Sequence, residues 1–328
     1  MLPIRGTMML SPKSVTRVGL VGLGTVGLGW AASYLAKGFD VVATDVSPHV
    51  EAGAHSFLSR AWSSLVALNV TSVENCPTHR LTIVPSIHDA VREAHIVHEN
   101  TPERLDLKRQ ILSDIEAAAA PSVIIASSSG GIPPSPLQSQ MRNPERFVIV
   151  HPFNPSHLIP LIEVLGGEKT DPNAIDWVMT LMRKIGKHPI RLNREMTGYL
   201  TNRLQFALLR EAINCLAEGV ASPRSIEDAV RYGLAPRWLV MGSLTTLTLA
   251  GGPKGMQQVL DNFSGAIDSW WADLGKLQMT PEIKKSLLAA AEEITEGRTV
   301  ADWISWRDDN LVTAIKTLNE IDRQREEQ

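Results

Sequence analysis

Short continuous hydrophobic runs alternate with longer amphipathic stretches over the first 195 residues or so. Short apolar runs bounded by turn residues are typical of strands that are buried on both faces of a parallel sheet. The runs predict strands at residues 15–21, 40–45, 81–84, 96–98, 122–126, 146–150 and 158–165. Helical patterns are found at residues 28–37, 86–94 and 101–120, with Pro102 expected in the first turn of the last. We therefore expect an α/β fold with a doubly wound sheet.

The pattern becomes mostly helical from about residue 196, and no internal repeat is visible. A long helix is expected from Thr197 through Glu218, and Gly and Pro residues predict breaks at 219–223, 233–236 and 251–255. The chain of 328 residues is long enough for two domains. We expect a flexible lead-in over residues 1–14, one domain over 15–195 and an all-α C-terminal domain over 196–328.

Composition excludes several classes of protein. The net charge of −3 argues against a nucleic-acid partner, which usually requires a basic face. No apolar run is long enough for a membrane-spanning helix, so we expect no membrane partner. Cys76 and Cys215 are too few for a disulfide framework, which favours a reducing compartment such as the cytoplasm. His95 and His98 have no third ligand at a suitable spacing, so we expect no metal.

A glycine fingerprint joins the first predicted strand to the first predicted helix: Gly22, Leu23, Gly24, Thr25, Val26 and Gly27. In such a turn the first glycine permits the bend, the second lets the backbone approach a pyrophosphate, and the third lets helix and strand pack closely. Asp45 ends the next strand roughly 20 residues on, where a carboxylate accepts the adenosine ribose hydroxyls. Because a carboxylate repels a 2′-phosphate, we expect a Rossmann-type domain that binds NAD. A flavin or another nucleotide is the alternative.

His151 stands at the end of a predicted strand and begins a loop stiffened by two prolines, Pro152 and Pro155. The next strand carries Glu163, and a hairpin-like return would bring it beside His151. A histidine that acts as a general base needs an anion to orient it, and a buried carboxylate needs a partner. We therefore expect a catalytic pair. A loop histidine with no chemistry and an exposed glutamate are the alternatives.

Asn202 is a polar residue near the start of the helix predicted from Thr197. We expect it to donate to a substrate oxygen, and a solvated helix position is the alternative. Together with the glycine fingerprint, these features describe an enzyme that moves a hydride to or from a secondary alcohol carbon.

These segments resemble the 3-hydroxyacyl-CoA dehydrogenase superfamily, and the likeness covers nearly the whole chain after Val15. The family's His-Pro-Phe-Asn-Pro signature stands at residues 151–155, its paired glutamate at Glu163, and its helix start at residues 198–203. The resemblance implies cofactor contacts at Glu103, Lys108 and Asn154. It also implies a C-terminal domain that closes the substrate pocket and carries a homodimer interface.

Within the superfamily the likeness is greatest to L-carnitine dehydrogenases, with lambda-crystallin-type L-gulonate 3-dehydrogenases next. It is carried by residues 231–233, 237–238, 249–252, 297–298 and 307–312. The branch implies a small free 3-hydroxy acid as substrate, with oxidation of L-carnitine to 3-dehydrocarnitine expected first. The alternatives are L-gulonate, a 3-hydroxyacyl-CoA thioester such as 3-hydroxybutyryl-CoA, and a protein that keeps the fold without activity.

One position departs from the family. The resemblance places a substrate-binding serine in the loop after the strand at 122–126, where this chain has Gly130 preceded by Ser129. Either Ser129 takes that role after a backbone shift, or the bond is missing. A quaternary ammonium substrate also requires aromatic faces. Phe153, Tyr199 and Trp238 are the candidates for such a cage, and ordinary core packing is the alternative for each.

Overall fold

The computed structural model describes residues 3–4 and 7–327, and the chain divides into two compact units, Met1–Arg203 and Leu204–Gln328. The domain limits expected above stay predictions. Residues 1–2 and 5–6 of the expected lead-in lie outside the described residues. Within the rest of that segment, β1 (Pro3–Ile4) pairs with β2 (Thr7–Met8), and the Leu10 carbonyl accepts a hydrogen bond from Trp177 Nε1 at 2.5 Å.

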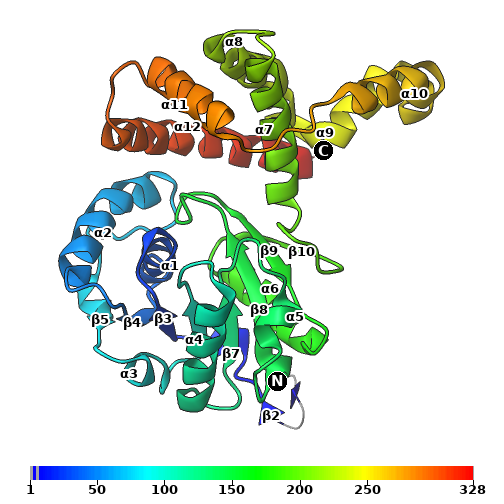
Figure 1. Ribbon diagram of the computed structural model, residues 1–328. Coiled ribbons are helices and arrows are strands. Elements are labelled where there is room, and N and C mark those ends of the chain that lie inside the picture. The colour runs from blue at the N-terminus through cyan, green and yellow to red at the C-terminus, as the bar shows by residue number, and fades with distance from the viewer. Residues whose placement is uncertain (1–2, 5–6, 328) are drawn as a thin grey trace. The chain divides into compact units, whose positions relative to one another are not determined.

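An eight-stranded sheet organises the first unit, in the order β10-β9-β8-β7-β6-β3-β4-β5 (Figure 1). The strands are β3 (Arg17–Val21), β4 (Asp40–Thr44), β5 (Leu81–Ile83), β6 (Ile96–Glu99), β7 (Ile124–Ser127), β8 (Phe147–Pro152), β9 (Leu161–Leu165) and β10 (His188–Arg191). Neighbouring strands are parallel except for the antiparallel pair β8–β9. The expected α/β class is therefore confirmed. The chain order reverses between β3 and β6, which is the point where such sheets bind ligands.

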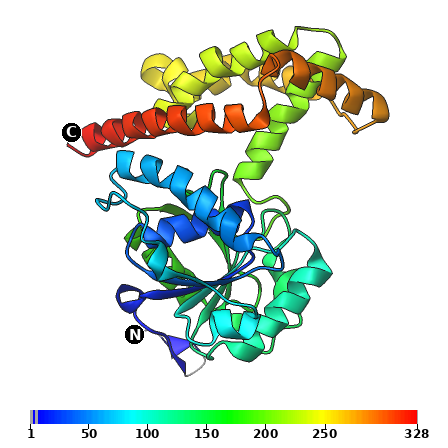
Figure 2. The same ribbon diagram turned by 90° about the vertical axis from the view of Figure 1, so that its left-hand side faces the viewer.

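Helices cover both faces of this sheet, as the turned view also shows (Figure 2). One buried cluster combines side chains of α1 (Thr25–Leu35), α2 (Val50–Ala67) and α6 (Pro172–Lys184). The other combines side chains of α3 (Ile87–Val91), α4 (Leu105–Ala118) and α5 (Pro134–Gln138). Burial of the strands on both sides explains why they appear in the sequence as continuous apolar runs.

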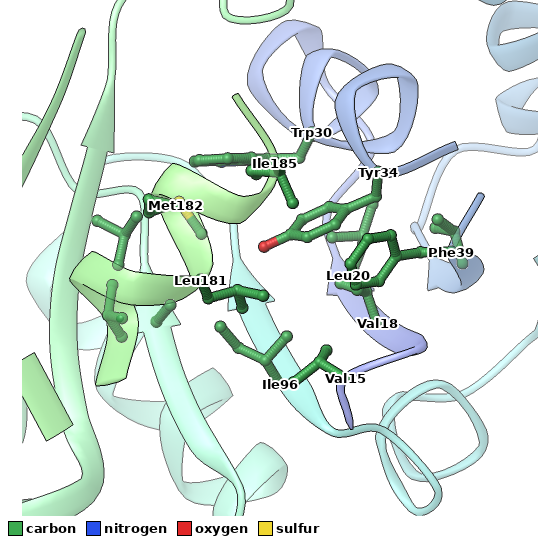
Figure 3. Close-up of a cluster of buried hydrophobic side chains, with 14 of the residues drawn as sticks. Val15, Val18, Leu20, Trp30, Tyr34, Phe39, Ile96, Leu181, Met182 and Ile185 are labelled. Carbon is green, nitrogen blue, oxygen red and sulfur yellow. The ribbon is translucent and has the colours of Figure 1, made fainter. Parts of the chain in front are cut away.

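The larger cluster packs α1 and α6 against the central strands, with Trp30 and Tyr34 among its largest side chains (Figure 3). Within it, the Tyr34 hydroxyl lies 2.7 Å from His98 Nε2. The Trp30 ring lies 4.5 Å from the His98 ring, centroid to centroid. Burial lowers the pKa of His98 to about 3, so this imidazole is neutral inside the core. His98 therefore belongs to the packing of the first unit.

Several elements differ from the expectations. α4 begins at Leu105 after an N-cap at Arg104, so Pro102 is not in its first turn. α7 (Thr201–Ala217) begins later than Thr197, because Gly198 and Tyr199 have φ values of 74° and 50° that do not fit a helix. The expected break at 233–236 is wrong as well: the π-helical segment Ala229–Leu234 continues directly into α9. The expectations contain no counterpart of α2, α6 or β10.

The second unit is all-helical, as expected. α7 starts in the first unit and continues into the second, which also contains α8 (Pro223–Asp228), α9 (Ala235–Ala250), α10 (Met256–Asp273), α11 (Pro281–Thr295) and α12 (Val300–Glu326). Large apolar side chains of this unit are exposed, including Leu244, Leu249, Trp270 and Trp271. Among the described residues, no helix combines the length and the hydrophobicity that crossing a bilayer requires.

We predict that Val18→Ala, in the central strand β3, lowers the free energy of unfolding by about 2 kcal/mol, because it removes two fully buried methyl groups. Val73→Ala makes the same chemical change at a residue that is 51% exposed and serves as the control. Urea unfolding followed by circular dichroism measures both. Equal losses for the two variants would contradict the assignment of β3 to the core.

Candidate active site

A cavity of about 850 Å³ opens at the carboxyl ends of β3, β4 and β6. Its lining includes the glycine-rich turn, Asp45, Val46, Asn100 and Thr101. Its position is the one predicted for a ligand of a doubly wound sheet, where the strand order reverses. The first turn of α1 contributes Thr25 and Val26 to the wall. The cavity can therefore take a large anionic ligand near the N-terminus of α1.

The three fingerprint glycines have the geometry that a dinucleotide requires. Gly22 has a φ of +92°, which favours glycine. A Cβ on Gly24 would meet nothing within 4 Å, so the backbone there is open to a ligand. A Cβ on Gly27 would lie 2.0 Å from the Gly22 carbonyl oxygen, so any side chain would separate helix and turn. These residues fit an NAD pyrophosphate.

Asp45 is fixed at the rim of the same cavity. Its Oδ2 accepts the backbone N–H of Leu23 at 2.6 Å, and its Oδ1 accepts that of Ser47 at 2.8 Å. These bonds hold the carboxylate beside the glycine-rich turn. A carboxylate in this place suits a ribose with two free hydroxyls and repels a 2′-phosphate.

His151 and Glu163 are direct partners across the antiparallel pair of β8 and β9. His151 Nδ1 lies 2.9 Å from Glu163 Oε2, and both side chains are buried. The other carboxylate oxygen, Oε1, accepts the N–H of Thr201 at 2.7 Å and that of Leu200 at 3.2 Å. Burial acts to raise the pKa of Glu163, but the hydrogen bonds from His151 and Thr201 outweigh it and the pKa is lowered.

An ionised Glu163 accepts hydrogen bonds and donates none. His151 Nδ1 must therefore carry the proton in this contact, which leaves Nε2 as the acceptor of the neutral ring. Two aromatic rings hold the imidazole edge-on: Phe153 at 4.5 Å and Tyr199 at 5.4 Å, centroid to centroid. The imidazole is thus fixed in orientation and in tautomer.

The three aromatic residues expected to bind a quaternary ammonium have different surroundings in the structure. Phe153 is half-buried beside His151. Tyr199 is 1% exposed, and its hydroxyl donates to the Ile132 carbonyl at 2.6 Å, so it packs around His151 and does not line an open cage. Trp238 belongs to the second unit and is 38% exposed. Phe153 and Tyr199 are thus both in contact with the His151 ring, and the role of Trp238 stays a prediction.

The loop after β7 meets the catalytic pair through Gly130. Asn202 Nδ2 donates to the Gly130 carbonyl at 2.8 Å; its expected donation to a substrate oxygen stays a prediction. The Ser129 hydroxyl, in contrast, is buried and donates to Glu103 Oε1 at 2.6 Å. Gly130 is the loop residue next to the imidazole, because a Cβ built on it would lie 3.0 Å from His151 Nε2; a role of Ser129 in substrate binding stays a prediction.

Glu103 holds this loop in place. Its Oε1 also accepts the backbone N–H groups of Gly131 at 2.9 Å and Ile132 at 3.0 Å. Burial acts to raise its pKa, yet the hydrogen bonds from Ser129 and Ile132, together with the charge of Lys108, lower it on balance. Glu103 is thus an anion that fixes the backbone on both sides of Gly130.

Lys108 does not reach the cofactor cavity. It is 1% exposed, and its ammonium donates to both oxygens of Glu99 at 3.0 Å and to the Thr101 carbonyl at 2.9 Å. Glu99 also accepts the Ser127 hydroxyl at 2.5 Å. This buried ion pair ties α4 to the ends of β6 and β7. The expected contact of Lys108 with the cofactor stays a prediction.

The sequence analysis missed Glu99 and Asn100. Both follow the apolar run of β6, so polar residues at the carboxyl end of a buried strand were the available signal. Asn100 lines the cavity, and its Oδ1 accepts the Ser128 hydroxyl at 2.8 Å. Ser128 accepts in turn from Trp30 Nε1 at 2.9 Å. These two hydrogen bonds connect the cavity wall to Trp30 in the middle of α1.

The loop after β8 is held by a buried lysine. Lys187 Nζ donates to the carbonyls of Ser156 at 2.6 Å and Ile159 at 3.1 Å. Burial lowers the pKa of Lys187 to about 7. Asn154, expected on the cofactor side, is exposed on this loop. Its role stays a prediction.

Metal ligands are not clustered in the part of the chain that the structure describes: no group of three His, Cys, Asp or Glu residues there could hold a metal ion. Of the two histidines weighed for zinc, His95 Nδ1 accepts the N–H of Thr16 at 3.1 Å, and His98 lies in the core.

Comparison with known proteins agrees with this geometry. Residues 17–196 match the 3-hydroxyacyl-CoA dehydrogenase NAD binding domain, and residues 198–279 match the C-terminal domain of the same family. The chain belongs to the 3-hydroxyacyl-CoA dehydrogenase family and is an NAD-dependent dehydrogenase. The expected family and cofactor are confirmed.

Similar proteins of this family include several L-carnitine dehydrogenases and a dehydrogenase of known structure. The chain is 39% identical to an L-carnitine dehydrogenase of Streptomyces coelicolor over 313 residues, which are 95% of this chain and 98% of that protein. It is 37% identical to an L-carnitine dehydrogenase of Pseudomonas aeruginosa, with 92% and 93% covered. A solved 5-formyl-3-hydroxy-2-methylpyridine 4-carboxylic acid 5-dehydrogenase, described as an NAD⁺-dependent dismutase, has a TM-score of 0.81 at 32% identity, covering 93% of this chain and 99% of that one.

We predict that Glu163→Gln destabilises the fold in a pH-dependent way. Because the folded pKa of Glu163 is lowered below its unfolded value of about 4.3, its ionised form stabilises the protein above that pH. This contribution is lost as the pH falls through the folded pKa. At pH 7 the free energy of unfolding of the variant should be about 1–3 kcal/mol lower than that of the wild type. This difference should become smaller below a pH of about 4.

Urea unfolding of both proteins from pH 7 to pH 3 measures this difference. Glu168→Gln makes the same substitution at an exposed residue and should change little at any pH. A gap that stays constant down to pH 3 would contradict the ionised state of Glu163.

Proposed function

We propose that this protein oxidises the 3-hydroxyl of a small hydroxy acid with NAD, and that L-carnitine, converted to 3-dehydrocarnitine, is its substrate. One observation carries the chemistry: Glu163 binds Nδ1 of His151, which leaves Nε2, beside Gly130, as the hydrogen-bond acceptor of the ring. The relatives named L-carnitine dehydrogenase, similar over nearly the whole chain, support the substrate.

In the oxidative direction, His151 Nε2 takes the proton of the substrate hydroxyl. The bound NAD supplies the acceptor for the hydride that leaves the carbinol carbon. Glu163 stabilises the imidazolium that results, because its carboxylate lies 2.9 Å from Nδ1. Asn202 uses one amide N–H on the Gly130 carbonyl and has a second N–H for the developing alkoxide oxygen.

The remaining parts of the proposal concern the assembly and its place in the cell. A homodimer formed through the second unit is supported by the large apolar side chains exposed there. A cytoplasmic location is supported by Cys76 and Cys215, which are both free thiols. Size-exclusion chromatography with light scattering tests the first of these.

The substrate is tested by NADH formation with L-carnitine, L-gulonate, 3-hydroxybutyrate and 3-hydroxybutyryl-CoA. 5-Formyl-3-hydroxy-2-methylpyridine 4-carboxylic acid is included because of the similar solved structure. We expect the highest kcat/KM with L-carnitine, and at least about tenfold less with 3-hydroxybutyrate, because a quaternary ammonium is bound by aromatic faces. Equal turnover of these two acids would refute the assignment of carnitine, and preference for the thioester would point to the acyl-CoA branch.

We predict that His151→Ala lowers kcat by about 10²–10⁴, the range expected when a general base is removed. NAD binding should be retained, because His151 does not line the dinucleotide cavity. His88→Ala, at an exposed position of α3, is the control and should keep full activity. Near-normal turnover by the His151 variant would contradict the proposed role of His151 as the general base.

A further inference from the structure

The side chain of Asn100, directly after β6, lies against the glycine-rich turn. Its Nδ2 donates to the Gly22 carbonyl at 3.4 Å and to the His98 carbonyl at 3.2 Å. A Cβ built on Gly27 would lie 3.4 Å from the same nitrogen. Asn100 lines the dinucleotide cavity, but both N–H groups of its amide are used on backbone carbonyls. The amide nitrogen therefore acts on the turn and has no N–H left for a ligand.

The peptide unit between Gly22 and Leu23 is held at both ends. Its carbonyl accepts from Asn100, and its N–H donates to Asp45 Oδ2 at 2.6 Å. Because a peptide unit is planar and trans, these two groups point in opposite directions, and the two bonds together fix its rotation. Gly22 has a φ of +92° and no side chain of its own to restrain the turn. Rotation of this unit would release Asp45 from Leu23 and change the wall that a pyrophosphate meets.

The orientation of the Asn100 amide is set by two residues outside the cavity. Ser128 Oγ lies 2.8 Å from Asn100 Oδ1 and 2.9 Å from Trp30 Nε1. An indole N–H only donates, so Ser128 accepts from Trp30 and gives its single proton to Asn100 Oδ1. The amide oxygen is thereby held toward Ser128, and the amide nitrogen toward the turn. Neither Ser128 nor Trp30 lines the cavity, so their side chains act on a ligand there through Asn100.

We propose that Asn100, oriented by Ser128 and Trp30, is a positioning residue for NAD: it holds the glycine-rich turn in the conformation that fits the pyrophosphate. The proposal concerns the cofactor and does not depend on the substrate proposed above. It has a specific consequence. A change at Ser128, whose side chain lies outside the cavity, alters the affinity for NAD, and it does so only while Asn100 is present.

A double-mutant cycle tests this coupling, with the Kd for NAD measured by isothermal titration calorimetry. Ser128→Ala should weaken NAD binding about 2- to 12-fold, the effect of losing one hydrogen bond. Asn100→Ala should weaken it at least as much. Adding Ser128→Ala to Asn100→Ala should then change the Kd by less than about twofold, because residues that act through one contact are not additive. Ser63→Ala, the same change at an exposed serine of α2, is the matched control and should leave the Kd unchanged.

Thermal unfolding of each variant is measured alongside, because a merely structural role would lower the midpoint and leave the Kd of the folded protein unchanged. An unchanged Kd in Ser128→Ala overturns the inference. So do equal losses from Ser128→Ala with and without Asn100. Either result leaves the proposed substrate standing. If Asn100→Ala does not fold, Asn100→Leu, of similar size and without polar side-chain atoms, takes its place; should neither fold, Ser128→Ala against Ser63→Ala decides.

Discussion

The contact between His151 and Glu163 is the interaction on which the site depends. It exists because β8 and β9 are antiparallel neighbours in a sheet that is otherwise parallel, so that the two residues face each other across the register. The Glu163 carboxylate is buried, and it is stabilised by two kinds of donor: the imidazole, and the backbone N–H groups of Leu200 and Thr201. A buried charge that lost either partner would be costly. The same carboxylate therefore orients the base and fixes the chain where α7 begins.

A second anion, Glu103, has a similar role in the loop after β7, which contains Gly130. It holds the backbone around Gly130 while Asn202 holds the Gly130 carbonyl, so the base and the loop in front of it are each restrained by their own hydrogen bonds. The dinucleotide cavity is built differently, from glycines and from the first turn of α1, and carries few charges beyond Asp45. The dinucleotide cavity and the His151–Glu163 pair are thus built from separate sets of residues.

Much of the first unit could be predicted from local pattern. The glycine fingerprint, Asp45 and the seven apolar runs predict a nucleotide-binding sheet, because strands buried on both faces are continuously hydrophobic. α2 and α6 were missed, and so was β10, a short strand at the edge of the sheet whose residues alternate between exposed and buried. The start of α7 was placed too early because the positive φ values of Gly198 and Tyr199 are not visible in a helical pattern. Lys108 was assigned to the cofactor since nothing in the sequence shows that Glu99 takes up its ammonium.

The sequence by itself determined the class of fold, the cofactor and the pairing of His151 with Glu163, because each depends on residues that lie within one or two neighbouring elements. Only the tertiary structure decided which partner each hydroxyl, amide or ammonium group takes. The Ser129 hydroxyl donates to Glu103, the Tyr199 hydroxyl donates to the Ile132 carbonyl, and Gly130 lies beside Nε2 of His151. The physical reason is that a side chain's direction follows from the backbone of its own loop and from partners remote in the chain, and neither is encoded in a local pattern.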